Sequence, residues 1–289
     1  MVIVITGPTC TGKTDLSIYL AKKLNGEIIN ADSTQVYKGL DIATAKVKDQ
    51  EGIPHHLLSF VDITKDYSVF DYQKDARNCI DDIISRGKVP ILVGGTGLYI
   101  KASLYNYEFS SEIRDEYEGI SNDELYQRLL EVDPETTIHL NNRVRLITAL
   151  NYYKNQNKPY SEKEKSSKLL YDAIFIGLTT DREVLYYKIN QRVEKMMREG
   201  LLEEAQALYE SGVRTKAVMT PIGYKELFEY FDGYKTLEES TDLIKQKSRN
   251  YAKRQYTWFN HQMKLNWFDV NYENFTQTEE KILNFIKNH

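Results

Sequence analysis

A glycine-bounded loop directly after a short apolar run constrains this chain most. The run, Val2 to Ile5, is entirely β-branched, which is typical of a strand buried on both faces of a parallel sheet. From Lys13 to Leu24, apolar residues recur at three- and four-residue steps and predict a helix. The loop between them matches GxxxxGK(S/T) and consists of Gly7, Pro8, Thr9, Cys10, Thr11, Gly12, Lys13 and Thr14.

The residue types in this loop suit a polyphosphate. Glycines let backbone amides wrap around phosphate oxygens, and the start of the following helix adds positive potential. Lys13 supplies a cation, and the Thr14 hydroxyl is a ligand for Mg²⁺. The pattern leaves open whether the bound group is the tail of a nucleotide or another diphosphate.

Strand and helix patterns alternate along most of the chain. The further strands that we expect are 27–31, 56–60, 89–93, 173–178 and 264–270. The further helices that we expect here are 70–86, 182–198, 201–211, 238–261 and 278–287. This alternation predicts an α/β fold with a doubly wound parallel sheet, similar to that of P-loop NTPases.

One stretch departs from this alternation. Strand patterns are absent between about Ser110 and Ser167, where residues 123–132 and 144–153 are amphipathic and predict helices. We therefore expect a helical insertion domain at 113–170. The core domain would consist of residues 1–112 and 171–289.

Composition excludes several classes of protein. Charged residues make up 28% of the chain, and no apolar stretch approaches the roughly 20 residues that span a bilayer, so we expect no membrane helix. The two cysteines, Cys10 and Cys79, have no CxxC spacing, which argues against a disulfide framework or a zinc finger. We expect a cytoplasmic protein that is a monomer. The net charge of −4 argues weakly against nucleic-acid binding.

An acidic residue follows the second expected strand. The strand ending at Val93 runs into Gly94-Gly95-Thr96 without a carboxylate, whereas the strand before Asp32 delivers one to the sheet's carboxyl edge. Ligands of open α/β sheets gather at that edge, so we expect Asp32 to face a bound diphosphate. There it could accept a proton from a nucleophile or help to hold a metal ion. Ser33 and Gln35 add hydrogen-bonding groups.

Several motifs together resemble the bacterial tRNA dimethylallyltransferases, and their order and spacing fit that family over nearly the whole chain. In the first half the motifs are Gly7 to Thr14, Asp32 to Tyr37, Thr44 to Lys46, Pro54 to Leu57 and Val93 to Tyr99. In the second half they are Arg182 to Glu204, Ile222 to Glu226 and Ala252 to Phe259. The likeness is weakest in the insertion, at residues 141–150.

The resemblance implies a reaction and its residues. The family transfers a dimethylallyl group from dimethylallyl diphosphate to the exocyclic N6 amine of the adenosine 3′-adjacent to the anticodon in tRNA. The phosphate loop would hold the leaving diphosphate with Mg²⁺ on Thr14. Asp32 would be the general base, Thr96 would touch the reacting nucleotide, and Arg182 and Arg192 would close over the diphosphate. Residues implied to contact tRNA are Asp32, Ser33, Thr34, Gln35, Thr96, Arg145, Lys253 and Arg254.

A basic and aromatic stretch near the end suits the anticodon loop as partner. No acidic residue stands between Asp242 and Asp269, and such a stretch can neutralise an RNA backbone and stack on bases. A solvated helix face with its aromatic residues in the core is the other interpretation, and the two can coexist. The members of the stretch are Lys245, Lys247, Arg249, Tyr251, Lys253, Arg254, Tyr256, Trp258, Phe259 and Lys264.

Three other functions remain open at this point. An isopentenyltransferase acting on free adenine nucleotides would share the phosphate loop and Asp32, but it has less use for the insertion and the basic stretch. A small-molecule P-loop kinase would use Asp32 toward a hydroxyl and would consume ATP. A nucleotide-dependent RNA-binding switch would catalyse no transfer.

Overall fold

The computed structural model describes residues 1–107, 117–162 and 168–289. The chain separates into two compact units, Met1–Leu104 with Leu169–His289 and Tyr105–Lys168. The second unit starts at Tyr105, earlier than the position 113 that the sequence led us to expect, and part of the expected 113–170 range lies outside the described residues.

The first unit is built on one parallel sheet, which confirms the doubly wound α/β class. All neighbouring strands pair in parallel, in the order β3-β2-β4-β1-β5-β6. The strands are β1 (Val2–Thr6), β2 (Gly26–Asn30), β3 (His55–His56), β4 (Val89–Val93), β5 (Ala173–Thr179) and β6 (Asn266–Asp269). The four inner strands, β2, β4, β1 and β5, are almost entirely buried, as their unbroken apolar runs predict.

Helices cover both faces of this sheet. Ile3, Ile5 and Ile176 point to one face, where they share a core with α1 (Lys13–Leu24) and α11 (Phe275–Lys287). Helix α2 (Val69–Ser85) packs against β2 and β4 and contributes the buried Tyr72, and α3 (Gly97–Leu104) packs against α2. Because alternate residues of a strand point to opposite faces, the same short runs build both layers of the core.

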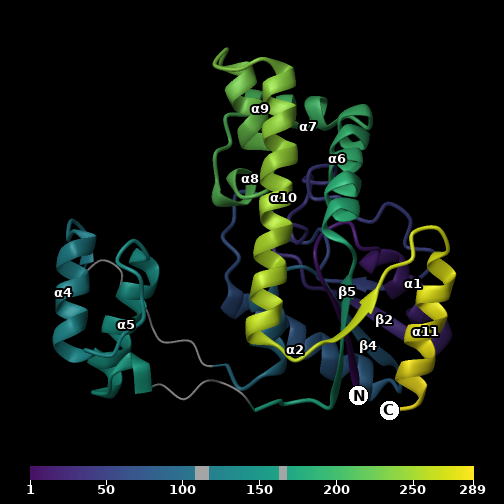
Figure 1. Cartoon of the computed structure of the whole chain (residues 1–289), viewed down its shortest axis with the longest axis horizontal. Helices are drawn as coiled ribbons and strands as arrows, with labels where there is room; N and C mark the ends of the chain where they lie inside the picture. Colours follow the sequence, from purple (N-terminus) through teal and green to yellow (C-terminus); the bar gives the residue numbers. More distant parts are fainter. Residues whose placement is uncertain (108–116, 163–167) are drawn as a thin grey trace. The chain divides into compact units, whose positions relative to one another are not determined.

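A group of helices rises beyond the carboxyl end of the sheet. Figure 1 shows them above the strands, at the end of this unit opposite to both termini. They are α6 (Arg182–Arg198), α7 (Leu201–Glu210), α8 (Lys216–Met219), α9 (Tyr224–Phe231) and α10 (Leu237–Gln262). In the described part of the chain, none of the helices combines the length and apolar character needed to cross a membrane.

One expected strand is wrong in extent, and three helices, α3, α8 and α9, were missed. The strand expected at 56–60 is limited to His55–His56, because Leu57 and Ser59 adopt positive φ angles of 58° and 52° that break an extended backbone. Helix α3 begins at Gly97, inside a glycine-rich run that is typical of a loop. Helix α9 begins after Gly223, which has a φ of +133° and no side chain to cap the helix.

The second unit is a small helical body with a core of its own, as expected for an insertion. It contains α4 (Asn122–Val132), α5 (Arg143–Gln156) and a short 3₁₀ turn at Tyr160–Glu162. Leu125 and Leu129 of α4 pack with Leu146 and Leu150 of α5. At the start of α5, Arg143 donates to the carbonyl oxygens of Ile120 and Tyr117 at 2.6 and 2.7 Å.

Candidate active site

Three loops meet at the carboxyl edge of the sheet, because β2, β4 and β1 are neighbours. The loop after β4 is bonded to the end of β2: Ala31 N donates to Val93 O at 2.7 Å, and Thr96 N donates to Ala31 O at 3.1 Å. A Cβ at Gly94 would lie 2.2 Å from the backbone of Ala31. This close approach explains why a glycine stands at this position.

The phosphate loop turns tightly between β1 and α1. Cys10 and Gly12 have positive φ angles of 66° and 80°. The Thr11 hydroxyl and the Lys13 ammonium both donate to the carbonyl oxygen of Pro8, at 2.9 and 2.6 Å. These bonds hold the Lys13 side chain over the loop that it follows.

Arg192 reaches this loop from α6. Its Nη1 donates to Thr9 Oγ1 at 2.8 Å and lies 3.7 Å from Cys10 Sγ. Burial, and after it the charge of Arg192, lowers the pKa of Lys13 to about 8. Two cationic side chains close together destabilise each other's charge, so an anion between them would be favoured.

Two adjoining cavities open beside the loop. The phosphate cavity, of about 790 Å³, is lined by the phosphate loop and by Lys46, Lys48, Lys188 and Lys195. The apolar cavity, of about 500 Å³, is lined by Ile189, Val193, Ile222, Ile244, Trp258 and Phe259 among others. The wall that the two cavities share includes Thr9, Asp32, Arg192, Tyr251 and Gln255.

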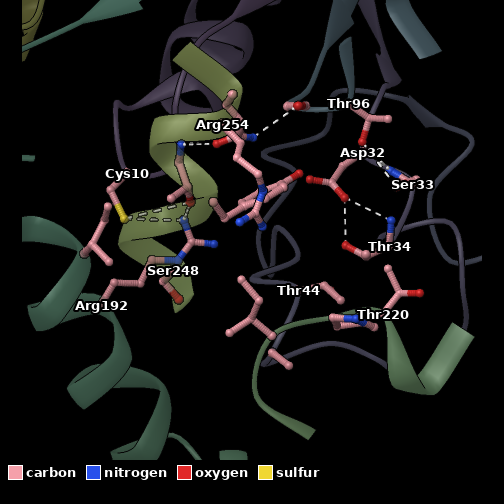
Figure 2. A pocket seen from close by; sticks show the side chains of 18 of the residues that line it. Cys10, Asp32, Ser33, Thr34, Thr44, Thr96, Arg192, Thr220, Ser248 and Arg254 are labelled. Carbon is pink, nitrogen blue, oxygen red and sulfur yellow. Dashed lines mark hydrogen bonds between the residues drawn. The ribbon is translucent and has the colours of Figure 1, made fainter. Parts of the chain in front are cut away.

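Asp32 lies in a tight turn on this shared wall. Its Oδ1 accepts hydrogen bonds from Thr34 N and Thr34 Oγ1 at 3.0 and 2.7 Å, so half of the carboxylate is fixed by its own turn. Among the described residues no donor is bonded to Oδ2. Figure 2 shows Asp32 on one side of the apolar cavity and Arg192, with Cys10, on the other.

Thr96 lies next to this turn. It precedes α3, but its hydroxyl accepts from Ser33 N at 3.0 Å and donates to Ser33 Oγ at 3.3 Å instead of capping that helix. The Tyr251 hydroxyl of α10 also lies near Thr96 and Gln255. Burial, and after it the nearby Asp32 carboxylate, raises the pKa of Tyr251, so this hydroxyl keeps its proton beside Asp32.

Sequence reasoning missed the residues that brace the phosphate loop from the end of the chain. Gln255 accepts from Thr9 N at 3.0 Å and donates to Gly95 O at 3.1 Å, so it joins two of the three loops. The Tyr272 hydroxyl donates to Cys10 O at 2.9 Å. Gln255 lies in a motif that we had noted, and only the fold brings it beside the loop.

Among the other expected site residues, Arg182 does not line the site, whereas Gln35 does. Arg182 is exposed at the start of α6 and lies over the ring of Tyr186, 5.2 Å from its centroid. Arg182 lines neither cavity. It stands ten residues before Arg192 on the same helix, which corresponds to about 15 Å along the helix axis. Gln35 lines the phosphate cavity, but its amide donates to Thr44 O at 2.8 Å. Arg145 belongs to the second unit.

The basic stretch proves less uniform than its sequence suggests. Lys245 and Lys247 are paired with Glu194 and Glu226, at 3.2 and 2.7 Å, because the fold brings in acids from other segments. Lys253 and Arg254 are exposed, and no acidic partner is bonded to them in the described residues; Arg254 also lines the apolar cavity.

The aromatic residues of the stretch are largely internal. Tyr256 stacks on Trp267 with 5.1 Å between ring centroids, and Phe259 is fully buried. Tyr251, Trp258 and Phe259 line the apolar cavity. The interpretation of a helix with its aromatics packed inside therefore applies to Tyr256 and Phe259, while three of the four aromatic rings also face the site.

The donor set near the phosphate loop fits a magnesium ion that arrives with its ligand. Thr14 is exposed on the phosphate cavity, whereas the described residues contain no group of three or more His, Cys, Asp or Glu side chains that could hold a metal. Mg²⁺ in phosphate sites is held by few protein oxygens, with phosphate oxygens and water completing its shell. A single hydroxyl beside a diphosphate satisfies that pattern.

Comparisons with known proteins agree on one family. The protein-family model described as IPP transferase matches residues 35–262, and the family model described as isopentenyl transferase matches residues 1–53. A tRNA dimethylallyltransferase of Anoxybacillus flavithermus is 50% identical over 99% of this chain and 96% of its own. That of Bacillus subtilis is 49% identical over 93% of this chain and 90% of its own.

Solved structures give the same result. The tRNA delta(2)-isopentenylpyrophosphate transferase of Staphylococcus epidermidis is 41% identical, covers 99% of this chain and 98% of its own, and superposes with a TM-score of 0.76. A eukaryotic dimethylallyltransferase captured acting on tRNA is 33% identical, covers 100% of this chain and 80% of its own, and superposes with a TM-score of 0.88. The chain belongs to the IPP transferase family.

Proposed function

We propose that the protein transfers a dimethylallyl group from dimethylallyl diphosphate to the N6 amine of the adenosine 3′-adjacent to the tRNA anticodon. The observation that carries this proposal is the position of Asp32 on the wall between a cationic phosphate cavity and an apolar one. A diphosphate in the first cavity and an extruded base in the second would meet at this carboxylate. The relatives' names support both substrates.

The phosphate cavity stabilises the leaving group. As the allylic carbon–oxygen bond breaks, negative charge grows on the diphosphate, where Lys13, Arg192 and the loop amides can interact with it. Mg²⁺, held by Thr14 and the diphosphate oxygens, supplies further charge neutralisation when bound. This use of the loop requires no hydrolysis of a nucleotide.

Asp32 acts on the nucleophile. The lone pair of the adenine amine is delocalised into the ring, so the amine attacks well only if a base removes its proton as the new carbon–nitrogen bond forms. Oδ2 of Asp32 takes that proton, while the bonds from Thr34 hold Oδ1 in place. Thr96, bonded to Ser33 and close to Tyr251, lies where it can orient the base.

The apolar cavity suits a base removed from its stack. Extrusion costs a few kcal/mol, and less in a single-stranded loop than in a duplex. Trp258 and Ile222 offer apolar surface to the base, and Arg254 at the rim can contact the backbone. We propose that the enzyme acts as a monomer in the cytoplasm, where its tRNA substrate is found.

A transfer assay tests this function. Radiolabelled dimethylallyl diphosphate and Mg²⁺ are incubated with unmodified tRNA carrying adenosines after its anticodon, and in parallel with AMP. We expect label in tRNA, and a loss of about 10²- to 10⁴-fold in rate for Asp32→Ala with diphosphate binding retained.

The other outcomes separate the alternatives. Label in AMP alone would identify an isopentenyltransferase of free nucleotides. ATP consumption without prenyl transfer would identify a kinase. Full activity of the Asp32→Ala variant on tRNA would support the proposed reaction but refute the role of Asp32 as its general base.

A further inference from the structure

One wall of the phosphate cavity is a loop outside the phosphate-binding motif. We call the residues 41–48 the wall segment. Thr44 of this segment lines both cavities. The members that line the phosphate cavity are Asp41, Ile42, Thr44, Ala45, Lys46, Val47 and Lys48.

The wall segment is held by a carboxylate from a distant helix. Glu204 of α7 accepts hydrogen bonds from three successive backbone amides, those of Asp41, Ile42 and Ala43, at 3.0, 2.9 and 3.1 Å. The Tyr224 hydroxyl donates to the same carboxylate at 2.7 Å. Hydrogen bonds to an ionised acceptor are roughly twice as strong as neutral ones, so the three from the backbone amides fix the loop firmly.

Two glycines precede the helices that carry Glu204 and Tyr224. A Cβ at either glycine would make only ordinary van der Waals contact with the wall segment, 3.5 Å from Ile42 Cδ1 for Gly200 and 3.4 Å from Ala43 Cβ for Gly223. Both glycines have positive φ angles, 103° and 133°, which other residues rarely adopt. They belong to the motifs Arg182 to Glu204 and Ile222 to Glu226, which resemble the family's pattern, and neither glycine had a role in the reaction above.

We propose that Glu204 is a positioning residue that holds the wall segment in the shape required to bind the diphosphate. This inference rests on the proposed function for its substrate. Glu204 lines neither cavity and so acts through the loop alone. Asp32 is held by Thr34 and Thr96 by Ser33, so the chemical step does not depend on the hydrogen bonds between Glu204 and the wall segment.

The variant Glu204→Gln tests this role because it keeps the shape of the side chain but removes its charge. We expect the Kd for inorganic pyrophosphate, measured by calorimetry, and the KM for dimethylallyl diphosphate each to rise about tenfold, the value of one weakened charge-assisted bond. The kcat should stay within about twofold, because the transition-state contacts of the reacting atoms are kept. Glu203→Gln, an exposed neighbour on α7, should match wild type.

Hydrogen exchange supplies a readout independent of transfer. Peptides covering residues 41–48 should exchange faster in Glu204→Gln, while those covering β1 and α11 should not change. Exchange that is unaltered, or equally faster in every peptide, would overturn the proposal, as would a fall in kcat as large as the rise in KM. If the wild-type protein binds pyrophosphate but transfers nothing to tRNA, the proposed function fails. The role of Glu204 is then still tested by the Kd for pyrophosphate and by hydrogen exchange of residues 41–48.

Discussion

Among single residues, Lys13 gives the clearest expectation for pH. Its pKa is lowered to about 8 by burial and by Arg192, so the free enzyme loses this charge as the pH rises through about 8. The charge is therefore fully present only below that value. We expect kcat/KM for dimethylallyl diphosphate to fall above pH 8 by up to about tenfold, since kcat/KM reports the free enzyme.

A second variant isolates this effect. Lys13→Arg keeps its charge at every working pH, so its activity, even if lower, should show no such decline. Direct pyrophosphate binding, measured from pH 7 to 9.5, should follow the same two curves. A decline of equal size in both proteins would assign it to another group.

Residues of the site divide by the range of their contacts. The phosphate loop and Asp32 were predictable because each is a local pattern at the end of a strand. Gln255 and Tyr272 were not, since their partners Thr9 and Cys10 lie 246 and 262 residues away in sequence. Their local surroundings carry no sign of those partners.

Secondary-structure elements were predictable where the apolar pattern was long. The bounds of α1, β4 and α6 are those expected, since each has a regular period and a clear boundary. Helix α3 was missed because its residues are mostly buried and lack a polar face. Its place is fixed by packing against α2, which no pattern within the helix expresses.

At the scale of elements, one buried carboxylate joins the amino ends of several strands. Glu27 of β2 is only 2% exposed and accepts from Arg86, Lys88 and His56, at 2.6 to 2.8 Å. We expect Glu27→Gln to lower the free energy of unfolding at pH 7 by about 2 to 3 kcal/mol, because cations keep their positions without a counter-charge. Urea denaturation measures it.

The pH dependence of that loss is also fixed in sign. The bond from Arg86, helped by Lys88 and His56, holds the pKa of Glu27 far below its ordinary 4.5. Its contribution is therefore complete above about pH 4.5 and is lost as the pH falls toward the depressed folded value. The difference in free energy of unfolding between wild type and Glu27→Gln should therefore become smaller only at acidic pH. Glu51→Gln, which removes an exposed ion pair with Lys22, should cost at most about 1 kcal/mol.

For the whole molecule, the net charge is unfavourable for RNA binding, whereas the charge near the site is favourable. The chain carries −4 overall, yet α10 presents exposed cations where the apolar cavity opens. RNA binding responds to the charges that lie near its phosphates, because charges beyond about 10 Å are screened at ordinary salt. The acidic total is thus compatible with an RNA substrate.

Salt dependence separates the two quantities. Replacing Lys253 and Arg254 together by alanine should lower the slope of log Kd for tRNA against log salt by about 1.4 to 1.8, since each phosphate contact contributes about 0.7 to 0.9. Replacing Lys281 and Lys287 of α11 by alanine changes the net charge equally but should leave the slope unaltered. Filter binding at several salt concentrations measures both. Equal slopes for the two double variants would mean that overall charge, and not the cations of α10, governs the encounter with tRNA.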